Sequence, residues 1–209
     1  MDQEMQFADR LAAAVKKAGS ITCVGLDPRK AQLPRPLQDS VTEDTNKQWA
    51  AAYQAFCYEI IDVVKELVAC VKPQAAFFEA LGPDGMVALG NVIRYAEQAG
   101  LLVITDGKRN DIGSTATAYA DAYLGASSPW GSDSLTVSPY LGRDSFEPFA
   151  DMCDQRDGGI FVLVKTSNPG GGLFQDRETE GKTLYQSVAD LVRELNSTRL
   201  GECGYGPVG

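Results

Sequence analysis

Histidine is absent from this chain of 209 residues. A protein without histidine has no Ser-His or Cys-His nucleophile pair, no histidine metal ligand and no histidine proton shuttle. Any catalysis by this chain must therefore use Asp, Glu, Lys, Cys or Tyr side chains.

Basic residues and long apolar runs are also scarce. The chain has 19 Lys and Arg against 28 Asp and Glu, a net charge of −9, which disfavours nucleic-acid binding because phosphate backbones attract basic surfaces. No apolar run approaches the roughly 20 residues that span a bilayer. The acidic start, residues 1–4, lacks the basic region of a secretory signal. We therefore expect a cytoplasmic protein with no nucleic-acid partner and no membrane partner.

The cysteines are few and scattered. The five are Cys23, Cys57, Cys70, Cys153 and Cys203, an odd number with no C-x-x-C pair. This spacing favours free thiols in a reducing cytoplasm over a disulfide framework or a zinc site.

Short apolar runs alternate along the chain with longer amphipathic stretches. The apolar runs predict buried strands at 20–26, 69–74, 101–105, 134–138 and 160–164. Apolar periodicity predicts helices at 7–15, 49–67, 85–98, 114–123, 145–153 and 184–195. Continuous apolar strands that alternate with amphipathic helices indicate an α/β protein whose parallel strands are covered by helices.

Polar side chains follow the predicted strands, as they do on the catalytic face of a TIM (β/α)8 barrel. They are Asp27, Lys72, Asp106, Lys108 and Ser167. A flavodoxin-like open sheet would also place its site at the strand ends, but usually with a glycine-rich phosphate loop after the first strand. The sequence there is Asp27-Pro28-Arg29, so the barrel is favoured.

The number of strand–helix units falls short of a closed barrel. About five are predicted, whereas a barrel has eight and typically about 250 residues. A sixth strand should begin in residues 204–209. We expect residues 1–209 to form a single barrel domain that is C-terminally incomplete; a truncated chain and a five-stranded open sheet are the alternatives.

A charged cluster is predicted at the end of the third strand. Asp106 and Lys108 share one side of that strand because residues i and i+2 point the same way. Asp111 follows in the loop or first helical turn, and Lys72 ends the neighbouring strand about 4.8 Å away. The alternative is a cluster of solvated charges without function.

Such an array suits the loss of CO2 from a carboxylate substrate. A carboxylate of the protein repels the carboxylate of the substrate, and the repulsion is relieved as CO2 leaves. A neighbouring lysine then stabilises and protonates the carbanion, so neither a metal nor an organic cofactor is needed. A Mg²⁺ site at Asp27 and Asp106 is an alternative, although the lysines at the same edge disfavour a cation.

Five motifs in order along nearly the whole chain resemble the orotidine 5′-phosphate decarboxylase family, in particular its longer bacterial branch. They are Val24-Gly-Leu-Asp27-Pro28, Val71-Lys72-Pro73-Gln74, Asp106-Gly-Lys-Arg-Asn-Asp-Ile112, Ser138-Pro-Tyr-Leu-Gly142 and Lys165-Thr-Ser-Asn-Pro-Gly170. The resemblance implies a carboxy-lyase that converts orotidine 5′-monophosphate to UMP and CO2 in de novo pyrimidine biosynthesis. It implies no cofactor, a nucleotide substrate and a homodimer with shared active sites.

The resemblance also implies roles for individual residues. Lys72, Asp106, Lys108 and Asp111 would form a charged catalytic network. Lys108 would donate the proton to C6 of the pyrimidine, and Asp106 would lie against the departing carboxylate. Asp111 would reach across the dimer interface into the site of the partner.

The implied substrate contacts come from several strand ends. Ile112 and Thr115 would cross the interface together with Asp111. Asp27 and Lys72 would hold the ribose hydroxyls, and Ser167 would bond the pyrimidine.

The family grips the substrate phosphate with loops after its last strands, and these have no counterpart in residues 1–209. Two alternatives therefore stay open. One is a Mg²⁺-dependent sugar-phosphate lyase or aldolase of the same suprafamily, and the other is a truncated barrel without catalytic activity.

Overall fold

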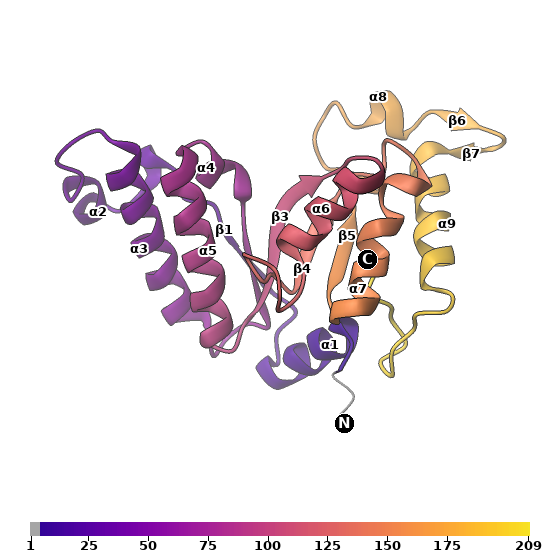
Figure 1. Ribbon diagram of the computed structural model, residues 1–209, viewed down its shortest axis with the longest axis horizontal. Coiled ribbons are helices and arrows are strands. Elements are labelled where there is room, and N and C mark those ends of the chain that lie inside the picture. Colours follow the sequence, from indigo (N-terminus) through magenta and orange to yellow (C-terminus); the bar gives the residue numbers. More distant parts are fainter. Residues whose placement is uncertain (1–4) are drawn as a thin grey trace.

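Five parallel strands form one sheet in the computed structural model, which describes residues 5–209 (Figure 1). The acidic start at 1–4 lies outside the described residues. The strands are β1 (Cys23–Leu26), β2 (Cys70–Pro73), β3 (Leu102–Arg109), β4 (Ser134–Val137) and β5 (Gly159–Val162). Their order in the sheet is β1-β2-β3-β4-β5. A flavodoxin-like sheet would have the order 2-1-3-4-5, so the strictly sequential order confirms the predicted α/β fold of the TIM-barrel type.

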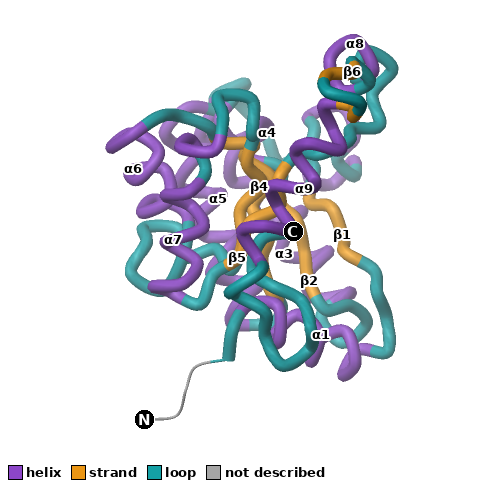
Figure 2. The backbone as a smooth tube through the Cα atoms, turned by 90° about the vertical axis from the view of Figure 1, so that its right-hand side faces the viewer, coloured by secondary structure: helices purple, strands orange, loops and turns teal. Residues whose placement is uncertain are grey.

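Helices follow the strands and cover one face of the sheet (Figures 1 and 2). The longer helices are α1 (Phe7–Ala18), α3 (Asn46–Val64), α5 (Gly82–Gln98), α6 (Gly113–Tyr123), α7 (Glu147–Arg156) and α9 (Leu184–Asn196). The shorter ones are α2 (Arg35–Asp39), α4 (Ala75–Glu79), α8 (Gly172–Gln175) and the 3-10 turns η1 (Lys30–Gln32) and η2 (Arg143–Ser145). A small antiparallel hairpin, β6 (Glu178–Thr179) and β7 (Lys182–Thr183), precedes α9. No helix of residues 5–209 is both long and apolar enough to cross a bilayer.

Side chains of the strands alternate between the helix-covered face and the opposite face. Val71 and Val103 are fully buried in a core cluster with α3 and α5, and Leu135 and Ile160 belong to a second cluster with α6 and α7. Since neighbouring residues of a strand point to opposite faces, the residues between these positions face what would be the inside of a barrel. This alternation brings polar side chains of β2, β3 and β4 together.

The last residues of the chain pair with β5. Ile160 bridges to Val208 in parallel, the Gly209 amide donates to the Ile160 carbonyl at 2.8 Å, and the Val162 amide donates to the Gly209 carbonyl at 2.8 Å. These bonds place residues 208–209 beside β5, where the sequence predicts that a sixth strand begins, but the structure contains an isolated bridge there and not an extended strand.

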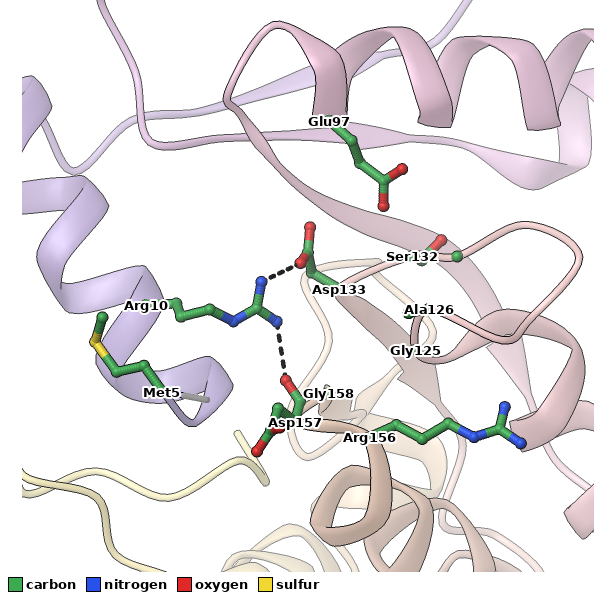
Figure 3. Close-up of a pocket in the computed structure, with 11 residues that line it drawn as sticks. Met5, Arg10, Glu97, Gly125, Ala126, Ser132, Asp133, Arg156, Asp157 and Gly158 are labelled. Carbon is green, nitrogen blue, oxygen red and sulfur yellow. Dashed lines mark hydrogen bonds and ion pairs between the residues drawn. The ribbon is translucent and has the colours of Figure 1, made fainter. Parts of the chain in front are cut away.

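Helix α1 packs across the amino ends of the strands, where an ion pair holds it in place (Figure 3). Arg10 lies 2.5 Å from Asp133 and also donates to the Asp157 carbonyl at 2.9 Å. The second carboxylate oxygen of Asp133 accepts the Val103 amide at 2.8 Å. Asp133 therefore ties α1 to β3 and to the start of β4. A cavity of about 440 Å³ lies beside this contact, with Glu97 on its wall.

Candidate active site

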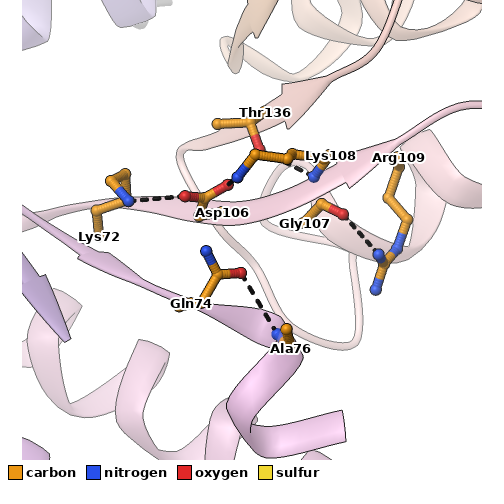
Figure 4. Close-up of polar contacts among 8 residues, drawn as sticks. All are labelled: Lys72, Gln74, Ala76, Asp106, Gly107, Lys108, Arg109 and Thr136. Atoms are coloured by element: carbon orange, nitrogen blue, oxygen red, sulfur yellow. Dashed lines mark hydrogen bonds and ion pairs between the residues drawn. The ribbon is translucent and has the colours of Figure 1, made fainter. Parts of the chain in front are cut away.

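Strand β3 carries a buried carboxylate between two lysines (Figure 4). Asp106 is only 7% exposed. Its Oδ2 accepts a hydrogen bond from Lys72 Nζ of β2 at 2.7 Å, and its Oδ1 accepts one from Lys108 Nζ at 2.5 Å. The predicted grouping of these three side chains at neighbouring strand ends is thus what the structure contains.

A threonine on β4 completes the contacts of this carboxylate. Thr136 Oγ1 donates to Asp106 Oδ1 at 3.0 Å and accepts the backbone N–H of Lys108 at 2.9 Å. The sequence interpretation missed Thr136. The available signal was its place in the alternation of β4, where Ser134 and Thr136 put hydroxyls on the face opposite the apolar Leu135 and Val137.

The backbone at Lys108 departs from ordinary strand geometry. Its φ is +47°, a left-handed conformation that costs a non-glycine residue roughly 1–3 kcal/mol. The β3–β4 register shifts between Thr105 and Arg109, so this stretch is a bulge. Bulges re-aim side chains and occur next to active sites.

The arrangement keeps Asp106 ionised. Burial by itself would raise the pKa of Asp106, but hydrogen bonds from Lys108 and Lys72, the positive charge of Lys72 and the Thr136 hydroxyl together lower that pKa below 3.8. Two ammonium groups against one carboxylate leave the cluster with a net positive charge, which favours an anionic ligand.

Arg109 points away from this cluster and fastens the end of β3. Its guanidinium donates to the Gly107 carbonyl at 2.6 Å and to the Tyr123 hydroxyl at 2.9 Å, and it forms an ion pair with Glu79 of α4. Glu79 and Tyr123 are thus structural partners of β3, which spacing in the sequence did not indicate.

The other predicted residues lie near the strand ends without joining the cluster. Asp27 and Ser167 are exposed, and among residues 5–209 no hydrogen bond or ion pair joins either of them to Asp106 or the two lysines. Asp27 follows Leu26, whose carbonyl accepts the Gln74 amide at 3.1 Å. Since Gln74 bridges to Asp106, Asp27 lies two strands away from that carboxylate at the same edge.

Asp111, Ile112 and Thr115 lie at the start of α6. The carboxylate of Asp111 accepts the Ile112 amide at 2.8 Å and has no contact with Asp106 or the lysines in the part of the chain described. Ile112 is 57% exposed, and Thr115 is exposed as well. Their role in the site of a partner stays a prediction.

No group of three or more His, Cys, Asp or Glu side chains within residues 5–209 is placed to hold a metal ion. Asp27 and Asp106, the pair considered for Mg²⁺, are not gathered into such a group.

The fold and the site define an α/β-barrel protein with a Lys-Asp-Lys cluster at the carboxyl ends of its strands. The sequence model of the orotidine 5′-phosphate decarboxylase / HUMPS family matches residues 21–206, and the chain belongs to that family.

Individual relatives agree with this assignment. An orotidine 5′-phosphate decarboxylase of Rhodopirellula baltica is 70% identical over an alignment of 209 positions that covers 98% of this chain and 69% of the relative. The crystal structure of a putative orotidine 5′-phosphate decarboxylase from Streptomyces avermitilis superposes with a TM-score of 0.85 at 37% identity, over 98% of this chain and 68% of that one. The OMP decarboxylase of Leishmania donovani has a TM-score of 0.77 at 37% identity, with 98% and 69% covered. The chain thus spans about two thirds of the length of these relatives.

Proposed function

We propose that this chain converts orotidine 5′-monophosphate to UMP and CO2, as a cofactor-free carboxy-lyase of de novo pyrimidine biosynthesis. The observation that carries the proposal is the buried Asp106 carboxylate held between Lys72 and Lys108 at 2.7 and 2.5 Å. The relatives named decarboxylases support the same reaction.

Asp106 and Lys108 supply the chemistry. Because its pKa is lowered, Asp106 is anionic at neutral pH and repels a carboxylate placed against it. When the bond from C6 to the carboxylate breaks, the electron pair stays on C6 and CO2 leaves, which ends the repulsion. Lys108 Nζ transfers a proton to C6 to give UMP, and the neutral amine then regains a proton from solvent. The interaction is more favourable in the transition state than with bound substrate, which is the condition for catalysis.

The ribose and the base are held by the strand-end residues. Lys72 and Asp27 contact the ribose hydroxyls, and Ser167 bonds the pyrimidine. Lys72 lies near the end of β2, Asp27 directly follows β1, and Ser167 lies in the loop after β5, which is the edge where barrel enzymes bind substrates.

The active form is a homodimer in which the start of α6 enters the neighbouring site. Support comes from the exposed apolar side chain of Ile112 and from the carboxylate of Asp111, whose one hydrogen bond among residues 5–209 is to the adjacent Ile112 amide. The free cysteines fit a reducing cytoplasm as the location.

Replacing Lys108 tests the reaction. With purified protein and orotidine 5′-monophosphate, the pyrimidine absorbance should fall for the wild type. It should not change measurably for Lys108→Ala, since general acid catalysis contributes about 10²- to 10⁴-fold and the electrostatic contribution is lost with it. Circular dichroism checks that the variant is folded.

Lys182→Ala is the matched control, because Lys182 also pairs with an aspartate, Asp190, but at the surface of the hairpin and α9. It should keep full activity. Decarboxylation by Lys108→Ala at the wild-type rate would refute the assigned proton donor. A wild-type activity that EDTA abolishes would instead favour the Mg²⁺-dependent lyase.

A further inference from the structure

The hydroxyl group of Thr136 contacts both residues that the proposed reaction uses, Asp106 and Lys108. Thr136 Oγ1 contacts the Asp106 carboxylate at 3.0 Å and the Lys108 backbone amide at 2.9 Å, and the contact with Asp106 is buried. A hydroxyl has one proton to donate. Because its oxygen accepts from the Lys108 amide, that proton is free to point at Asp106 Oδ1.

The Lys108 amide has lost its ordinary strand partner. Thr105 pairs with Leu135 and Arg109 with Val137, so four residues of β3 span the length of two on β4. The ladder resumes where the Ser138 amide donates to the Arg109 carbonyl at 2.9 Å. Within the bulge, the Thr136 side chain takes the N–H that a β4 carbonyl would otherwise accept.

This contact fixes a conformation that Lys108 would not adopt unaided. A positive φ at a non-glycine residue persists only where the surroundings hold it. At Lys108, with φ of +47°, the hydrogen bond to Thr136 anchors the residue whose ammonium group lies 2.5 Å from Asp106.

Thr136 is also the neutral donor to Asp106. Asp106 Oδ1 accepts from Lys108 and from Thr136, whereas Oδ2 accepts from Lys72. When Lys108 gives up its proton it becomes a weaker donor, but the threonine hydroxyl does not change its charge. Oδ1 therefore keeps one hydrogen bond throughout the reaction.

We propose that Thr136 is a positioning residue, which holds the Asp106 carboxylate and the Lys108 backbone in register while the proton moves to the substrate. This inference rests on the proposed function. It assigns Thr136 no contact with substrate.

The test compares Thr136→Val, which keeps the shape but lacks the hydroxyl, with Thr136→Ser, which keeps the hydroxyl. Thr136→Val should lower kcat about 10- to 100-fold, the scale expected when a reacting group is misplaced by up to about 1 Å. KM should change less than about 3-fold, because ground-state contacts stay. Thr136→Ser should return kcat to within about 3-fold of the wild type.

The pH profile gives a readout that a purely structural role would not move. The Thr136 hydroxyl is one of the groups that lower the pKa of Asp106. Without it that pKa rises, so the acidic limb of kcat should move to higher pH in Thr136→Val and return in Thr136→Ser.

Thr105→Val is the matched control. Thr105 is a buried β3 threonine whose hydroxyl lies 2.5 Å from Ser132 Oγ on the other face of the strand. The Thr105→Val variant therefore measures how much kcat falls when a buried hydroxyl that does not contact Asp106 is removed. The kcat of this variant should equal that of the wild type.

Wild-type kcat and pH profile in Thr136→Val would overturn the inference, and so would an equal loss in Thr136→Ser. If circular dichroism finds Thr136→Val unfolded, Thr136→Ala replaces it as the variant without a hydroxyl and is compared with Thr136→Ser. An active wild type with inactive Lys108→Ala upholds the proposed function in either case, so failure of the positioning role is distinguishable from failure of the reaction.

Discussion

Cys23 is the residue whose environment most changes its reactivity. Cys23 and Cys70 are direct partners across β1 and β2. A hydrogen bond from the Cys70 thiol lowers the pKa of Cys23 to about 7; burial acts against this, and the positive charge of Lys72 assists it. Since the thiolate is the nucleophile, iodoacetamide should alkylate Cys23 first, with a rate that rises around pH 7. Peptide mass spectrometry after timed labelling measures this.

Cys57 is the internal comparison. It is fully buried, and burial raises its pKa to about 12, so it should remain unlabelled in the folded protein. In Cys70→Ala the midpoint for Cys23 should move towards the ordinary value near 9. Equal labelling of Cys23 and Cys57 in the wild type would contradict this interpretation.

Part of the site was predictable from residue spacing alone. Asp106 and Lys108 are two residues apart on one strand, and Lys72 ends a neighbouring strand, so strand geometry predicted that the three side chains lie close together. The structure brings Lys108 to Asp106 through a bulge, which the spacing did not predict. The alternation of β4 indicated the face on which Thr136 lies, but its contacts were not predictable, because a threonine in a strand is ordinary for its β-branched shape. Its contact depends on the bulge at Lys108 and on the register of β4, and both are tertiary features.

At the scale of the elements, the packing of α1 against the amino end of β5 requires a glycine at position 159. A Cβ at Gly159, the first residue of β5, would lie 2.1 Å from the ring of Phe7, which is buried and packs edge-on against Phe161. Gly159→Ala should therefore destabilise the fold by roughly 1–3 kcal/mol, the usual cost of overpacking. Urea unfolding followed by circular dichroism measures the change in free energy.

Gly170→Ala is the control for this substitution. Gly170 lies in an exposed loop, and the nearest atom to an added Cβ is 3.7 Å away. Its unfolding midpoint should match that of the wild type. If Gly159→Ala unfolds at the same urea concentration as this control, the Phe7 contact does not limit the packing of α1.

The sequence predicted that the longer helices exist, but it did not predict the residues at which they begin and end. The periodic stretch 49–67 corresponds to Asn46–Val64, which begins three residues earlier because the Thr45 side chain caps the Gln48 amide at 3.3 Å. Helix α4, helix α8, strand β6 and strand β7 span two to five residues each. Elements of this length are too short to produce a periodic signal.

At the scale of the whole molecule, a shared active site can be tested by mixing inactive variants. Lys108→Ala and Asp111→Ala should each be nearly inactive as homodimers. In a heterodimer of the two, one site carries both defects and the other carries neither. When equal amounts of the two variants pair at random, about half of the dimers are heterodimers, and each of these has one intact site. The mixture should therefore recover roughly a quarter of the wild-type turnover, measured by the absorbance assay after joint refolding.

Mixing Lys108→Ala with Asp106→Ala is the matched control. Both side chains belong to the same chain's cluster, so every heterodimer site keeps one defect and no turnover should return. Recovery in this control, or none in the first mixture, would argue against a site to which Asp111 of a second subunit contributes.

The global fold was the most predictable feature, since alternating apolar strands and amphipathic helices allow few arrangements. The sequential strand order and the pairing of Val208 with Ile160 agree with that expectation. The predicted first strand, 20–26, proved too long. Only Cys23–Leu26 pairs with β2, and Ile21 is 91% exposed.

The Arg10–Asp133 contact lies at the amino ends of the strands, away from the residues of the proposed reaction. It gathers α1, the start of β4 and the turn after α7 at one rim of the molecule, whereas Asp106 and the lysines occupy the opposite rim. Substitution of Asp133 is therefore expected to lower the melting temperature of the protein while Asp106, Lys72 and Lys108 keep their mutual contacts.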